Sequence, residues 1–112
     1  MQVPLQITVR HMTHSPELDS RIRADAGKLE EFYRGIISCH VVIEEQGRHQ
    51  QQGRWFNVRI VVSVPGHELV VNRDHDEDVY VALRDAFASL TRRLEDVARR
   101  QHGQVKTHES PG

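Results

Sequence analysis

The longest amphipathic pattern in the chain runs from Asp78 to Arg100. Its apolar residues recur every three or four positions, the spacing of a helix with one buried stripe; they are Val79, Leu83, Ala86, Phe87, Leu90, Leu94 and Val97. The pattern predicts a long helix that packs against a sheet. The acidic residues before it, in the connection from Arg73 to Asp78, favour a helix N-terminus because they oppose the positive end of the helix dipole.

A second helix is predicted from Ser15 to about Tyr33 or Arg34. Ser15 and Pro16 are typical of an N-cap and a first helical position. Its buried face is formed by apolar residues at helical spacing, namely Leu18, Ile22, Ala26, Leu29 and Tyr33. Gly35 follows where a glycine commonly ends a helix.

Four other segments alternate between apolar and polar residues, which is the period of a strand with one buried face. They are Leu5 to Arg10, Ile37 to Glu44, Phe56 to Val64, and Glu68 to Asn72. A polar hairpin loop is expected from Glu45 to Arg54, and Pro65-Gly66 predicts a tight turn between the last two strands.

The predicted order is therefore β-α-β-β-β-α, an α+β fold. A strand-helix-strand connection places the first two strands parallel, and the short connections make the later pairs antiparallel. We expect a four-stranded mixed sheet with two helices packed on one face, similar to a double-stranded-RNA-binding domain. The other face should be exposed and chemically mixed; it carries Gln6, Thr8, Arg10, His40, Val42, Asn57, Arg59 and Val61. The domain should span residues 1–100, with 101–112 a flexible polar tail or linker.

Composition limits the functional classes. The chain of 112 residues is long enough for one domain with one core. Its net charge is -1, from 15 basic and 16 acidic residues, so nucleic-acid binding would depend on local clusters of cations. The single Cys39 cannot form an intramolecular disulfide, and neither a signal peptide nor an apolar run of membrane-spanning length is present. We expect a cytoplasmic protein without a membrane partner.

Catalytic motifs are absent from the sequence. It has no phosphate loop, dinucleotide-binding turn, nucleophile elbow or paired cysteine motif. We therefore expect no enzyme, no cofactor, no metal and no small-molecule substrate. The acids between Asp74 and Asp78 fit helix capping better than cation binding. Trp55 precedes Phe56, so one of the two must point away from the core; Trp55 could stack on a base or pack under the adjacent loop.

The arginines of the last helix allow two interpretations. They lie on both flanks of its apolar stripe, and could be a solvated helix face or a phosphate-binding surface. Asp85, Glu95 and Asp96 lie among them and would repel a phosphate.

The residues also carry a family resemblance. The element order, the sequence Lys28-Leu29-Glu30 in the first helix, Glu77 to Leu83, and Leu90 to Leu94 are together similar to the ribosome hibernation-promoting factor and ribosome-associated inhibitor family, whose older label is sigma-54 modulation protein. The resemblance covers about Leu5 to Arg100. It corresponds to a short form or an isolated N-terminal domain, and the polar ending is similar to the approach to a further domain.

The resemblance implies a function by occlusion. The domain would bind the 30S subunit or 70S ribosome at 16S rRNA, in the channel used by messenger and transfer RNA, and inhibit translation in stationary phase or stress. Off the ribosome we expect a monomer. The rRNA-binding residues carried over by position are Lys28, Arg84, Arg92, Arg93, Arg99 and Arg100, with Arg34 and Arg73 as further candidates. Replacing Arg92 and Arg93 by glutamate should weaken 30S association and leave folding intact.

Two alternatives remain from the sequence. The domain could bind RNA other than the intact ribosome, in which case naked RNA hairpins would compete as well as 30S subunits. It could instead be a protein-interaction module such as a transcription modulator. Binding by such a module would be insensitive to salt, whereas phosphate contacts weaken steeply as salt rises.

Overall fold

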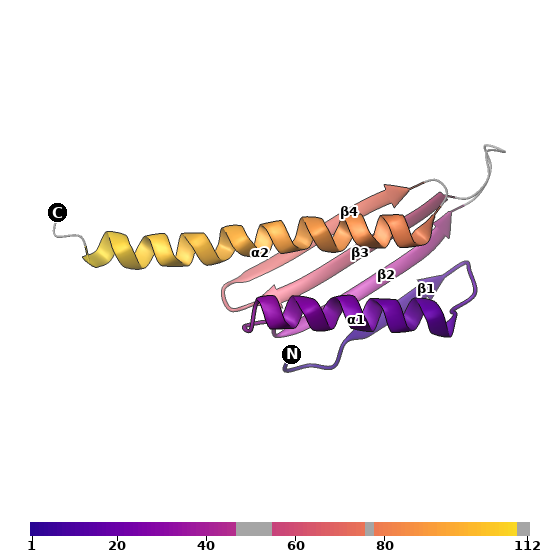
Figure 1. The fold of residues 1–112 in the computed structure, drawn as a ribbon, viewed down its shortest axis with the longest axis horizontal. Helices are drawn as coiled ribbons and strands as arrows, with labels where there is room; N and C mark the ends of the chain where they lie inside the picture. Colours follow the sequence, from indigo (N-terminus) through magenta and orange to yellow (C-terminus); the bar gives the residue numbers. More distant parts are fainter. Residues whose placement is uncertain (47–54, 76–77, 110–112) are drawn as a thin grey trace.

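The computed structural model describes residues 1–46, 55–75 and 78–109. Strands and helices follow in the predicted order (Figure 1): β1 Gln6–Arg10, α1 Pro16–Phe32, β2 Ser38–Gln46, β3 Trp55–Val64, β4 His67–His75 and α2 Val79–Glu109. The hairpin loop expected up to Arg54 falls largely on residues 47–54, which lie outside the described residues. Its first two residues, Glu45 and Gln46, belong to β2.

The strands form one mixed sheet in the order β1-β2-β3-β4. β1 pairs with β2 in parallel, and the β2–β3 and β3–β4 pairs are antiparallel. Pro65 and Gly66 form the turn between β3 and β4, and Gly66 has a φ of 81°, a conformation that a residue without Cβ adopts at no steric cost. The predicted α+β fold and strand directions are confirmed.

Alternate strand residues point to one face, where both helices cover them (Figure 1). Val41, Ile43, Val58, Ile60 and Val62 are fully buried at the centre of this layer. The buried stripe of α2 packs on it, with Leu83, Leu90 and Leu94 having no exposed surface. Apolar burial of this kind is the main term that holds the two layers together, because it removes apolar surface from water.

Local sequence chemistry sets the ends of α1. Ser15 Oγ accepts a hydrogen bond of 3.1 Å from the Leu18 N–H, and Pro16 begins the helix. The helix ends at Phe32, next to the predicted end near Tyr33 or Arg34. Tyr33 is the C-cap; its backbone is extended, and its N–H still donates to the Leu29 carbonyl at 2.9 Å. The extended backbone of Tyr33 therefore ends the helix, and Gly35 lies in the turn that follows.

Two elements are longer than expected. β4 continues through Arg73 and Asp74 to His75, because main-chain pairing with Phe56 to Val58 of β3 does not require apolar side chains. α2 continues past Arg100 to Glu109 and projects beyond the sheet (Figure 1). It ends two residues before Pro111, which cannot extend a helix and restricts the residue before it. The division into a domain and a tail stays a prediction.

The second sheet face is uncovered by the helices. Gln6, Arg10 and Arg59 are exposed there, and the other five residues predicted for this face are half-buried. Side-chain hydrogen bonds link neighbouring strands: Thr8 Oγ1 and His40 Nε2 lie 2.8 Å apart, and Asn57 Nδ2 donates to Asp74 Oδ1 at 2.6 Å.

Candidate nucleic-acid interface

A groove of about 300 Å³ lies between α1 and α2. Its floor is largely apolar, and three cations lie along it. The residues that line it are Arg21, Asp25, Lys28, Leu29, Phe32, Arg84, Phe87, Ala88 and Thr91. Phe32 is half exposed, at 49%. Of the cations predicted to bind rRNA, the groove brings together Lys28 and Arg84.

The three groove cations differ in their partners. Arg21 donates through Nε to Asp25 at 3.2 Å, and its guanidinium carbon lies 5.9 Å from the centre of the Tyr80 ring. Arg84 donates to Asp85 Oδ1 from Nε and Nη2, both at 3.2 Å. Lys28 is exposed and forms no ion pair with the described residues. Its ammonium group is therefore the groove cation most available to an external anion.

Arg92 and Arg99 lie on the outer side of α2. At 100° per residue they fall about 60° to 80° from Arg84, away from the buried stripe. Both are exposed. Arg99 is paired with the Asp96 carboxylate, whereas Arg92 forms no ion pair within the described part of the chain. We term these four exposed helix cations, Lys28, Arg84, Arg92 and Arg99, the helical basic surface.

Arg73 and Arg93 instead donate hydrogen bonds to other residues of the protein, on the side of α2 that faces β4. Arg93 Nη1 donates to the Val70 carbonyl at 2.5 Å. Arg73 Nη1 donates to the Asn72 carbonyl at 3.1 Å, and its Nη2 donates to Ser89 Oγ at 3.0 Å. Ser89 is buried, at 7% exposure. These two arginines thus lie apart from the groove and already have protein acceptors.

The remaining two candidates lie at helix margins. Arg34 is exposed just after α1 and borders a shallow hollow with Gly27, Glu30 and Glu31, so two carboxylates accompany it. Arg100 is exposed on α2, on the flank that carries Arg93 by helical spacing. The structure therefore divides the eight predicted residues among several surfaces, and their contact with rRNA stays a prediction.

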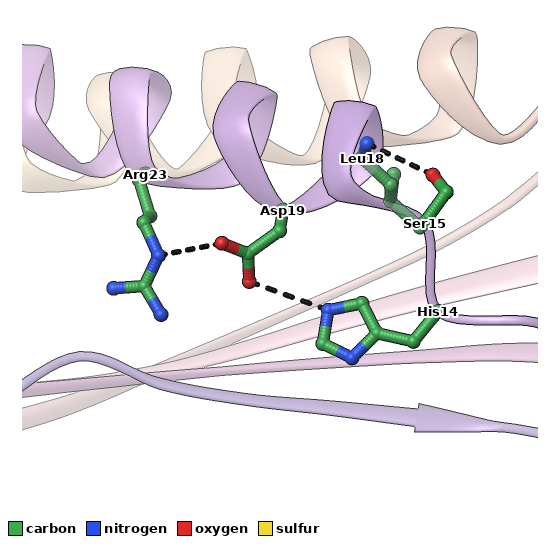
Figure 2. Close-up of polar contacts among 5 residues, drawn as sticks. All are labelled: His14, Ser15, Leu18, Asp19 and Arg23. Atoms are coloured by element: carbon green, nitrogen blue, oxygen red, sulfur yellow. Dashed lines mark hydrogen bonds and ion pairs between the residues drawn. The ribbon is translucent and has the colours of Figure 1, made fainter.

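The start of α1 carries a polar cluster that the sequence did not single out. Figure 2 shows Asp19 between Arg23, whose Nε donates at 2.7 Å, and His14, whose Nε2 lies 3.3 Å away. The Arg23 hydrogen bond, aided by His14, lowers the pKa of the Asp19 carboxyl below its ordinary value of 3.8. The i, i+4 spacing of Asp19 and Arg23 was the available signal. This cluster stabilises the helix start.

Two smaller predictions concern aromatic and acidic residues. Phe56 is buried and Trp55 is 42% exposed, so Trp55 is the residue that points away from the core. Stacking of Trp55 on a base stays a prediction. Asp78 caps α2 by accepting from the Tyr80 N–H at 2.8 Å, while Asp74 lies on β4. Residues 76–77 lie outside the described residues, and the described ones contain no metal-binding cluster of histidine, cysteine and acids.

Comparisons with known proteins agree with this architecture. The family model described as sigma 54 modulation protein / S30EA ribosomal protein matches residues 5–102. A ribosomal subunit interface protein from Coxiella burnetii has a similar fold, with a TM-score of 0.72, 17% identity, and coverage of 85% of this chain and 97% of that one.

The N-terminal domain of Protein Y from Thermus thermophilus is also similar. Its TM-score is 0.70 at 19% identity, covering 87% of this chain and 99% of the other. A comparison with curated protein sequences gave no match. Over the described residues, neither helix combines the length and apolar content of a membrane span.

Proposed function

Since the chain belongs to the sigma 54 modulation protein / S30EA ribosomal protein family, we propose that it binds the small ribosomal subunit and inhibits translation by occlusion. The site would be 16S rRNA in the channel that messenger and transfer RNA use, during stationary phase or stress. A domain bound there excludes RNA by its volume, so no chemical step is required. The protein would act in the cytoplasm, as a monomer when off the ribosome.

The helical basic surface is the observation that supports this proposal most directly. Lys28, Arg84, Arg92 and Arg99 are exposed on two helices that are anchored to one sheet. Side chains on rigid elements can meet phosphates at fixed positions without ordering the backbone first, and such contacts orient a protein without reading base sequence. A domain that must occupy one place on a folded rRNA needs this kind of contact.

The acids within this surface determine which of its cations contribute most to phosphate binding. Asp85 and Asp96 pair with Arg84 and Arg99, and all four side chains are solvent-exposed. Exposed ion pairs contribute about 0.2–1 kcal/mol, so a phosphate could replace the carboxylate at modest cost. Within the described part of the chain, Lys28 and Arg92 have no such pair to break. We expect these two residues to contribute most of the salt-dependent affinity.

The phenyl ring of Phe32 gives the groove a second chemical character. It is half exposed beside Lys28 in the groove lining. Unpaired rRNA bases stack on aromatic side chains, and each stacked base contributes about 1–3 kcal/mol. The groove therefore suits a phosphate together with an unstacked base, which is the chemistry of single-stranded or bulged rRNA.

Binding to purified 30S subunits tests the proposal. The double variant Lys28→Gln with Arg92→Gln should bind 30S more weakly than the unchanged protein. A matched control, Arg23→Gln with Arg59→Gln, removes the same charge from two exposed arginines outside the groove, one paired with Asp19 on α1 and one on the uncovered sheet face. Equal weakening by both variants would contradict the site. Equal competition by naked RNA hairpins would favour an RNA target outside the ribosome.

A further inference from the structure

β4 is an edge strand, and half of its main-chain groups face outward. Among the strands that the structure describes, it pairs with β3 alone. The turn at Pro65-Gly66 makes Val64 and His67 the closing pair, and antiparallel residues alternate between hydrogen-bonded and non-hydrogen-bonded pairs. Leu69 and Val71 therefore bond toward β3. The main-chain groups of Glu68, Val70, Asn72 and Asp74 point away from the sheet.

Two arginines donate hydrogen bonds to carbonyl groups that point outward from this edge. Arg93 reaches across from α2 to the Val70 carbonyl, and Arg73 donates to the Asn72 carbonyl. Arg73 is itself held by Ser89 Oγ on α2. Because Arg93 and Ser89 lie on the same helix, the contacts tie one flank of α2 to the edge. An added strand would need these same carbonyls as acceptors.

We infer that Arg93 and Arg73 prevent strand pairing at the β4 edge. The partner that they exclude is the β4 edge of a second copy of this chain. An open edge is a template for pairing, and charged side chains are a common means of preventing it. A guanidinium on the outward carbonyl blocks both the acceptor and the space beside it. This role accounts for two arginines that the helical basic surface does not include.

The residues of β4 are suited to pairing with a second β4 once Arg93 and Arg73 are replaced. In an antiparallel two-fold pair centred on Val70, Val70 meets the second copy's Val70, and Glu68 meets the second copy's Asn72. Val70 is among the exposed large hydrophobic side chains, at 38%, so this register buries apolar surface. A register centred on Val71 would instead oppose Glu68 and Asp74, which repel each other.

Sedimentation velocity of Arg93→Ala tests the inference. Loss of the Arg93 side chain should raise the self-association constant at least about tenfold, equivalent to about 1.4 kcal/mol. Adding Arg73→Ala to this variant should raise the constant further. Arg92→Ala is the matched control, because it removes the same charge at the adjacent residue without a contact to β4. It should remain as monomeric as the unchanged protein. Dimers formed equally by Arg92→Ala would overturn the inference.

A second substitution identifies the surface of association. Val70→Lys, introduced into Arg93→Ala, should restore the monomer because an edge lysine opposes strand pairing. A dimer that persists would overturn β4 as the interface. Arg93→Met keeps an unbranched side chain without an N–H donor and serves if Arg93→Ala loses its circular dichroism signal. A folded Arg93→Met protein that stays monomeric at every concentration would also overturn the inference.

Discussion

Arg92→Gln offers a quantitative test of how the protein would hold rRNA. Arg92 is exposed and forms no ion pair or side-chain hydrogen bond within the described residues. Its removal should therefore change the free energy of unfolding by no more than about 0.5 kcal/mol. Any loss of 30S binding would then reflect a lost contact and not a damaged fold.

The expected change in binding follows from the number of phosphate contacts that each variant loses. Each phosphate contact contributes roughly 0.7 to 0.9 to the slope of log affinity against log salt. Arg92→Gln should reduce the slope by that amount, and Lys28→Gln with Arg92→Gln by roughly 1.4 to 1.8 if the two act independently. A charged hydrogen bond is worth about 1.5–3 kcal/mol, so one substitution should raise the Kd about tenfold or more.

The assay is a titration of labelled protein with 30S subunits at several salt concentrations. Arg99→Gln should reduce the slope less than Arg92→Gln, because Arg99 is already paired with Asp96. Arg23→Gln, which lies about 140° around α1 from Lys28, controls for net charge. An unchanged slope in Arg92→Gln, or an equal change in Arg23→Gln, would refute the reasoning.

Three further predictions concern stability and reactivity. Leu90 has no exposed surface at the centre of α2, so Leu90→Ala should lower the unfolding free energy by about 2–5 kcal/mol; a smaller loss in urea titration would contradict close packing there. Because Arg23 lowers the pKa of Asp19, that carboxylate contributes stability that is present above about pH 4 and is lost as pH falls through the lowered pKa. Asp19→Asn should therefore flatten the acid limb of a Tm-against-pH curve, and an unaltered limb would argue against the contact. Burial raises the pKa of the Cys39 thiol to about 11, so alkylation at neutral pH should occur only in denaturant; rapid alkylation of the native protein would show an open core.

The sequence predicted features that depend on local chemistry. Ser15-Pro16 fixes a helix start through groups within one turn, and Pro65-Gly66 specifies a turn by its backbone preferences alone. The buried stripe of α2 was also readable, since Leu83, Leu90 and Leu94 recur at helical spacing. These signals were sufficient for the element order and the α+β fold.

Features that depend on distant residues were not readable. The continuation of β4 to His75 is set by pairing with Phe56, and its side-chain pattern carries no alternation that marks it. The Arg93 contact joins residues that are 23 positions apart and requires α2 to lie along the β4 edge. Neighbouring Arg92 and Arg93 looked equivalent in the sequence, yet the structure directs one to solvent and the other to a main-chain carbonyl.

Sedimentation on sucrose gradients tests the central claim most directly. The purified protein would be mixed with 30S, 50S and 70S particles at low and moderate salt. Our account predicts co-migration with 30S and 70S that diminishes as salt rises, because phosphate contacts release counterions on binding. Additional 100S particles would show whether it also drives ribosome pairing. Protein that stays at the top of the gradient at every salt concentration would contradict the proposed ribosome binding.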